Sequence, residues 1–294
     1  MASAMSVGRS PLLKIDFDKY PEQSPEHSAK EKILKERSKE YGTLGNSDLV
    51  FLAHLFLRWN ESKEKKMFCE KLGLSITGLK EMKQLYHQLD DSLSAVGFYD
   101  DKQSNENAKS WRLIRSCLVS ALSPTQMVRV ERGAVKYAET AEGSLEIEGP
   151  AKDLRFFIRG DQISTMKKYH DITEERVFIH PSSMNFIVTS YSCPWIVYHE
   201  LVRTSKAFLR DTTECSAYAL LLFGGDLKVE SSNNLIWIDG YVRLSANARI
   251  GALIGGLRGK IDDILSLKIA DPACDISSSI EMKLIVQLIV SDGL

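Results

Sequence analysis

The sequence predicts an α+β protein, with a small helical bundle domain followed by a small β-barrel and C-terminal helices. Apolar residues recur with helical period up to about residue 122. After Pro124 they alternate with polar residues, as they do in half-buried strands. The chain has 294 residues, of which 44% are hydrophobic, so we expect at least one full core and two structural units.

Charge and cysteine content exclude several classes of protein. The formal net charge of -1 excludes a uniformly basic nucleic-acid binder but allows a local basic strip. The five cysteines include no CxxC pair, which indicates reduced thiols rather than a disulfide framework or a zinc site. No apolar run is long enough to span a bilayer, and the first residues lack a signal-peptide core. We therefore expect a soluble intracellular protein without a membrane partner, cytoplasmic or alternatively nuclear.

Three segments make up the first half of the chain. Residues 1–12 have the composition of the end of a preceding segment, and residues 13–45 form a polar, charged connector that is either a solvated helix or loose chain. Residues 46–123 are predicted to form the helical domain. Its first helix follows the Asn-Ser-Asp cluster at 46–48, a good N-cap, and another starts near Ser75.

Residues 124–294 are predicted to form the barrel domain with its C-terminal hairpin and helices. Its central stretch contains three strand signals, at residues 177–179, 184–190 and 195–202. Several short strands flanked by helices are typical of a barrel of the OB type. We therefore expect an OB-like fold here.

A hairpin and two helices are predicted after the barrel. The hairpin spans residues 227–244, and the first helix follows Ser245 as its cap. The glycines of this helix have GxxxG spacing, for which we expect close packing against the barrel. The last helix is predicted to begin with a capping box at residues 278–281. Seven apolar residues of the first helix are expected to face the core: Ile250, Leu253, Ile254, Leu257, Ile261, Ile264 and Leu265.

The candidate binding residues gather where the central strands end in small hydroxylated and basic loops. Hydroxyl and guanidinium groups both donate hydrogen bonds to phosphate oxygens, so the basic loop is either a phosphate clamp or an ordinary solvated loop. The histidine at 180 is either a turn residue or a nucleic-acid contact, and Phe186 or Tyr191 could stack a base. The candidate set is His180, Ser182, Ser183, Arg203, Thr204, Ser205, Lys206, Arg210 and, on the first strand, Arg132.

No motif in the sequence predicts catalysis. The glycine-rich run at residues 255–260 has Ile254 where a phosphate-binding loop needs its first glycine. The residue after its lysine is Ile261, where magnesium binding needs a serine or threonine. GxGxxG, GxSxG and HExxH are absent as well. We expect no catalytic residue, metal or cofactor in this chain, and no ATP hydrolysis by it alone.

Five segments follow one another in the chain with characteristic gaps: NSDLVFLAHLFLRW, FCEKLGLSITGLKEMKQLYHQL, WRLIRSCLVSAL, VFIHPSSMNF and WIVYHELVRTSKAFLRD. In this order they resemble the C-terminal region of DEAH/RHA-type (DExH-box) ATP-dependent RNA helicases. The resemblance covers the chain from about Ala4 to its end. It implies that the helical half is the end of the helicase-associated ratchet domain and that the second half is the OB-fold domain. The family commonly has a Tyr-Pro-Asn turn where this chain has Ser-Pro-Thr at 123–125.

The resemblance also implies a function and partners. In the family, two RecA-like motor domains hydrolyse ATP with magnesium and move along RNA, while the ratchet and OB domains close the RNA channel. Carried over, it puts His180 and the serines at 182 and 183 near the RNA exit, and the loop 204–206 on RNA with Arg210 close by. The expected partners are single-stranded RNA, the helicase RecA-like core and a G-patch-type activator. The motor motifs are absent, so we expect a fragment; the alternative is a protein-interaction module that binds no RNA by itself.

Overall fold

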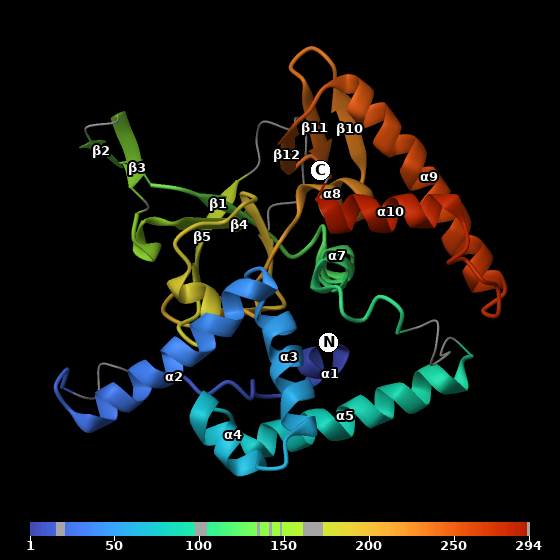
Figure 1. Ribbon diagram of the computed structural model, residues 1–294. Helices are drawn as coiled ribbons and strands as arrows, with labels where there is room; N and C mark the ends of the chain where they lie inside the picture. The colour runs from blue at the N-terminus through green and yellow to red at the C-terminus, as the bar shows by residue number, and fades with distance from the viewer. Residues whose placement is uncertain are drawn as a thin grey trace.

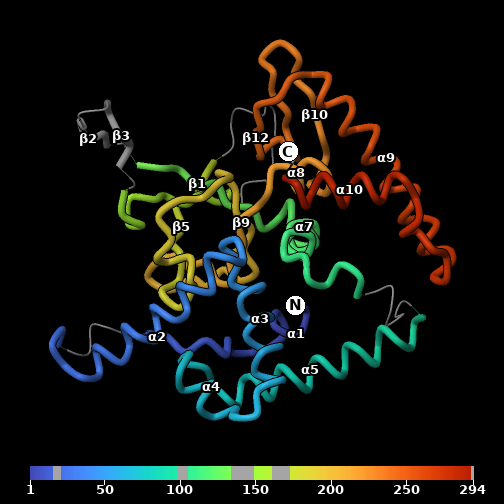
Figure 2. Tube along the Cα trace, in the orientation of Figure 1, coloured from blue at the N-terminus to red at the C-terminus, as the bar shows by residue number. Residues whose placement is uncertain are grey.

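The computed structural model describes residues 1–15, 21–97, 105–133, 136–140, 143–147, 149–160 and 173–292. A helical half, a curled sheet and a C-terminal hairpin with helices follow one another along the chain (Figure 1). In Figure 2 the blue-to-teal helices lie on one side of the sheet and the orange-to-red elements on another. The α+β class and the OB-like architecture predicted from the sequence are confirmed.

The helical half is built around α3 (Asp48–Glu61), whose apolar residues are almost all buried. The Ser47 hydroxyl accepts a hydrogen bond from the amide of Val50, which confirms the cap predicted at 46–48. Ser75 caps α5 in the same way, so the predicted helix start near Ser75 is confirmed. The other helices of this half are α1 (Ala2–Ser6), α2 (Pro25–Tyr41), η1 (Gly42–Leu44), α4 (Lys65–Leu72), α5 (Ile76–Ala95) and α7 (Trp111–Leu122).

The charged segment before α3 is anchored through Arg37 of α2. Its guanidinium is 2% exposed and donates to the carbonyls of Leu72 at 2.8 Å, Leu13 at 3.1 Å and Gly73 at 2.6 Å. Burial lowers the pKa of Arg37 to about 10. Three carbonyl acceptors compensate part of that burial. The helix that carries Arg37 therefore packs against the end of α4.

A seven-stranded sheet in the order β7-β8-β5-β4-β1-β6-β9 forms the barrel-like part. Neighbouring strands are antiparallel except for the parallel pair β5 and β8. Alternate residues of each strand point to opposite faces, and the inner face packs Val128, Phe156 and Val177 into one core. The strands are β1 (Met127–Glu131), β4 (Arg155–Arg159), β5 (Glu174–Ile179), β6 (Trp195–Val197), β7 (Glu200–Arg203), β8 (Ala207–Arg210) and β9 (Thr213–Glu214). A separate hairpin joins β2 (Lys136–Thr140) to β3 (Gly143–Ile147), and η2 spans Ala151–Asp153.

Of the strands predicted for the central stretch, the one at 184–190 is wrong and the one at 195–202 is confirmed only as two shorter strands. Residues 184–190 begin with the 3-10 helix η3 (Met184–Ile187), because the Ser183 hydroxyl caps the amide of Asn185 and turns the chain. Residues 195–202 form two strands, β6 and β7, with a break at 198–199. The predicted strand at 177–179 is confirmed as the end of β5.

The C-terminal part packs on α7 and the sheet through α8 (Ala217–Phe223). The predicted hairpin is confirmed as β10 (Leu227–Glu230) and β11 (Leu235–Ile238), and β12 (Val242–Ser245) adds a third strand. Then come α9 (Ala248–Ala270) and α10 (Ile280–Ser291). No helix in the described ranges is both long and apolar enough to span a bilayer.

The caps and packing of the last two helices differ from the prediction. Asn247 rather than Ser245 caps α9. Ser279 caps α10 through the amide of Met282, one residue later than the predicted capping box. Of the seven α9 residues expected to face the core, Ile254 is 6% exposed, whereas Leu253 is 66% exposed. The helix thus buries a narrower face than its apolar pattern predicted.

Candidate nucleic-acid interface

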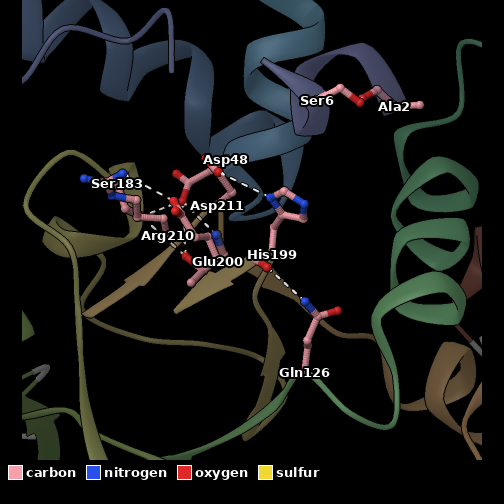
Figure 3. A network of polar contacts seen from close by, with 10 residues as sticks. Ala2, Ser6, Asp48, Gln126, Ser183, His199, Glu200, Arg210 and Asp211 are labelled. Carbon is pink, nitrogen blue, oxygen red and sulfur yellow. Dashed lines mark hydrogen bonds and ion pairs between the residues drawn. The ribbon is translucent and has the colours of Figure 1, made fainter. Parts of the chain in front are cut away.

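The loop that carries His180 is fixed by a buried carboxylate from the helical half. Asp48, at the start of α3, is 2% exposed. Its oxygens accept hydrogen bonds from the Ser183 hydroxyl at 2.6 Å and the Met184 amide at 2.9 Å. The amide and hydroxyl of Thr212 also donate to it, at 3.0 and 3.2 Å. Burial raises the pKa of Asp48 to about 6, although these donors act in the opposite direction. Figure 3 shows Asp48 and Ser183 at this junction of helix and sheet.

Ser183 therefore has a structural position instead of the exposed one that an RNA contact needs. It is 9% exposed, and its hydroxyl is used by Asp48 and by the amide of Asn185. Ser183 was predicted to contact RNA together with Ser182 because the sequence alone does not distinguish a buried serine from an exposed one in a loop. We leave Ser183 out of the candidate interface.

His180 and Ser182 stay at the surface and hold each other. The Nδ1 atom of His180 lies 3.1 Å from the Ser182 amide nitrogen and 2.7 Å from its hydroxyl. Because Nδ1 accepts, the ring proton sits on Nε2, which remains a donor. Burial and then the charge of Arg210 lower the pKa of His180. The ring is therefore neutral at pH 7, and its edge packs on Phe208 with centroids 5.8 Å apart.

The basic loop is the turn between β7 and β8. The Thr204 amide donates to the Lys206 carbonyl at 2.9 Å, which closes the turn and leaves residues 204–206 exposed. Arg203 pairs with Glu175 at 2.8 Å, and this pair lowers the pKa of Glu175. Arg210 reaches Glu200 at 3.3 Å. The Thr204 hydroxyl also donates to the Lys206 carbonyl, at 3.4 Å. The loop therefore offers the Ser205 hydroxyl, the weakly bonded Thr204 hydroxyl and the Lys206 ammonium, beside two arginines that are already paired.

Between these loops and β1, the outward face of the sheet carries rings with cations over them. The Arg129 guanidinium lies 4.8 Å from the Phe157 ring centroid. Arg176 lies 5.5 Å from the same ring and 5.3 Å from that of Phe178. The Lys206 ammonium lies 4.7 Å from Phe178. We call this set, together with Phe208, the aromatic row: Arg129, Phe157, Arg176, Phe178, Lys206 and Phe208.

Strand register produces the aromatic row. Phe157 on β4 stands opposite both Arg129 on β1 and Arg176 on β5. Phe178 on β5 stands opposite Phe208 on β8, with ring centroids 6.2 Å apart. The inner positions of these strands are filled by buried apolar residues, so Phe157, Phe178 and Phe208 are held on the outer face. Four residues of the row were not predicted from the sequence: Phe157, Arg176, Phe178 and Phe208. In alternating strands, aromatic residues at positions expected to be polar would have indicated these outward-facing rings.

The cations of the row differ in how they are paired. Arg129 makes two hydrogen bonds to the Glu174 carboxylate, and this contact raises the pKa of Arg129. Among the described residues, no carboxylate lies within salt-bridge distance of Arg176 or Lys206. Exposed ion pairs contribute little to stability, so Arg129 can exchange its carboxylate partner for a phosphate. Arg176 and Lys206 can bind a phosphate without first breaking an ion pair.

Arg132 lies apart from the row, beside a cleft of about 880 Å³ between β1 and the C-terminal hairpin. Its guanidinium donates to the Tyr191 carbonyl at 3.0 Å. Tyr191 itself is 5% exposed and packs edge-on against Phe156, so it cannot stack a base. Phe186 is 51% exposed, so its ring is accessible for stacking with a base. Within the described ranges, no group of three histidine, cysteine or carboxylate residues is placed to hold a metal.

Two protein-family models match the chain. The oligonucleotide/oligosaccharide-binding (OB)-fold model covers residues 114–227, and the C-terminal domain in RNA helicases covers residues 234–291. Together they span more than half of the chain. The first contains the aromatic row, and the second contains β11, β12, α9 and α10.

Several helicases are similar over most of this chain. The mouse (Mus musculus) ATP-dependent DNA/RNA helicase DHX36 is 28% identical over 255 residues, 83% of this chain and 23% of that protein. The DExH-box ATP-dependent RNA helicase DExH1 of Arabidopsis thaliana is 30% identical over 251 residues, 83% of this chain and 22% of that protein. A putative DEAH-box ATP-dependent helicase of Mycosarcoma maydis, UM11114, is 29% identical over 305 residues, 92% of this chain and 18% of that protein.

The chain spans less than a quarter of the length of these relatives. Its two matched segments coincide with the OB-fold and C-terminal parts described above, in the same order. The resemblance found in the sequence is confirmed: the chain belongs to the DEAH/DExH-type helicase family, as its C-terminal helicase-associated and OB-fold region.

Proposed function

We propose that this chain is the RNA-binding accessory region of an ATP-dependent RNA helicase and that it grips single-stranded RNA on the outward face of its sheet. The aromatic row carries this proposal. Aromatic rings stack unpaired bases of any sequence at about 1–3 kcal/mol per base, and interleaved cations hold the phosphates. The row supplies both on one surface.

The two loops predicted from the sequence border this surface. His180 touches Phe208, and Lys206 covers Phe178, so each loop contacts a ring of the row. The exposed hydroxyls of Thr204 and Ser205 are donors for phosphate oxygens. We retain His180, Ser182 and residues 203–206 with Arg210 as RNA contacts, and add Phe157, Arg176, Phe178 and Phe208.

In the parent protein this region would close the RNA channel beside the RecA-like core, which binds ATP and magnesium. The isolated chain would bind RNA without hydrolysing ATP. A G-patch-type activator is a further proposed partner of the OB-fold part.

Fluorescence anisotropy with a labelled single-stranded RNA tests the proposal. In single strands each phosphate contact contributes about 0.7 to the slope of log affinity against log salt concentration. The double variant Arg176→Ala, Lys206→Ala should therefore bind more weakly and flatten the slope by about 1.4. Arg249→Ala removes an exposed arginine on α9 and should change neither quantity.

An unchanged slope in the double variant would refute the placement of phosphates on the row. The alternative, a protein-interaction module that binds no RNA by itself, predicts that the unmodified chain gives no anisotropy change at all. The same titration thus decides between the two functions.

A further inference from the structure

The cleft beside Arg132 has two walls from different parts of the chain. One wall is β1 with the loop at 191–195, and the other is the strand pair β11 and β12. Its volume of about 880 Å³ falls in the range of small-molecule sites. The Tyr241 hydroxyl donates to the Phe157 carbonyl at 3.2 Å and lies 3.3 Å from Glu174, so the hairpin is tied to the barrel.

Trp237 presents a fixed ring to this cleft. Its neighbours Ile236 and Ile238 are at most 1% exposed and hold the inner face of β11, which leaves Trp237 on the other face. The indole Nε1 donates to Glu230 at 2.9 Å, which sets the ring orientation. Arg243, its cross-strand partner on β12, places its guanidinium 6.0 Å from the ring centroid.

Two guanidiniums of the cleft carry no ion pair. Arg132 donates to a backbone carbonyl and Arg243 lies over an indole, and no carboxylate in the described ranges lies within salt-bridge distance of either. Arg129 completes the wall with its charge held by Glu174. A stacking ring between unpaired guanidiniums suits one planar base with its phosphates.

The cleft continues the aromatic row. Arg129 covers the Phe157 ring of the row and also lines the cleft. We propose that the cleft between β1 and the C-terminal hairpin receives one unpaired nucleotide of the bound strand, with its base on Trp237 and its phosphates at Arg132 and Arg243. This inference rests on the proposed function, and it gives the C-terminal hairpin a part in RNA binding.

The test uses the full chain, a single-stranded RNA and two sets of variants. Cleft variants are Trp237→Ala, Trp237→Phe and the pair Arg132→Ala, Arg243→Ala. We expect about tenfold weaker binding for Trp237→Ala and for the arginine pair, and near-normal binding for Trp237→Phe, which keeps a stacking ring. Circular dichroism melting identifies any variant that fails to fold, and the arginine pair lies at exposed positions where folding is not at risk.

A second readout locates the nucleotide. RNA carrying 4-thiouridine is crosslinked by light and the modified peptide is identified by mass spectrometry; we expect crosslinks on the peptide that contains Trp237. Normal affinity in the arginine pair with no crosslink at the hairpin would overturn the inference and leave the row standing.

The row variants separate this inference from the proposed function. Weaker binding by the cleft variants with normal binding by Arg176→Ala, Lys206→Ala would refute the row and support the cleft. If the unmodified chain binds no RNA, both are overturned.

Discussion

Replacing Asp48 by alanine tests whether the helical half positions the loop that carries His180. Two backbone amides, those of Met184 and Thr212, and three hydroxyls donate to this carboxylate, the Tyr41 hydroxyl at 3.4 Å being the most distant. Each buried donor left without a partner costs about 1–3 kcal/mol. Since the substitution also removes the cost of burying the carboxylate, we expect a loss of about 3 kcal/mol in the free energy of unfolding at pH 7.5.

The same variant should reveal the pKa of Asp48, which burial raises to about 6 from an ordinary 3.8. Between these values the folded state keeps a proton that the unfolded state has lost, so this group's contribution to stability falls as pH rises from about 4 to 6. The alanine variant lacks that contribution. The difference between the two proteins should therefore be larger at pH 4.5 than at pH 7.5, by about 2 kcal/mol.

Urea denaturation followed by tryptophan fluorescence at both pH values measures these differences. Asp91→Asn, an exposed position on α5, is the matched control and should change stability by less than about 0.5 kcal/mol. A loss below about 1 kcal/mol for Asp48→Ala at pH 7.5 would refute the reasoning, because the junction donors would then not depend on the carboxylate. A pH-independent difference would refute the raised pKa alone.

Two further predictions concern α9 and the aromatic row. A Cβ at Gly251 would lie 2.5 Å from a methyl group of Val229, so Gly251→Ala should lower the free energy of unfolding by about 1–2 kcal/mol. Gly255 has open space around it, so Gly255→Ala should raise the free energy of unfolding by up to about 1 kcal/mol. Thermal melting of the two variants measures both changes. Phe178→Leu should weaken RNA binding about tenfold without changing the salt slope, because it removes stacking and no charge; equal weakening by Phe186→Leu would instead place the stacked base on η3.

The order of helices and strands was predictable because local patterns carry it. The cap at 46–48, the helix start near Ser75 and the hairpin within 227–244 depend on residues close together in the chain, and they are confirmed. The strand predicted at 184–190 failed for the opposite reason. Its conformation depends on Ser183, whose hydroxyl is held by a carboxylate 135 residues earlier in the chain. No local pattern contains that contact.

The residues of the candidate site also fall into those that local patterns predicted and those that depend on tertiary contacts. The loops at 180–183 and 203–206 were predicted because hydroxyl and basic residues follow strands directly. The aromatic row required the register of four strands, which brings Arg129, Phe157 and Phe178 together from different segments. Similarly, the apolar pattern of α9 predicted a wide buried face, but Gly251 and Ile254 are buried while Leu253 and Leu265 stay exposed. The register between strands and the part of a helix face that is covered both depend on tertiary packing, so the local sequence pattern did not determine them.

The row also explains how rings can remain on a water-facing sheet and still serve RNA. In the free protein the cations of Arg129, Arg176 and Lys206 cover the faces of Phe157 and Phe178, and such contacts contribute about 0.5–1 kcal/mol at exposed sites. A charge-assisted bond to a phosphate is stronger, so we expect a bound phosphate to move each cation off its ring. The uncovered ring face would then be open to a base. On the proposed function, phosphate and base binding are coupled, and losing the cations should weaken stacking as well as phosphate contact.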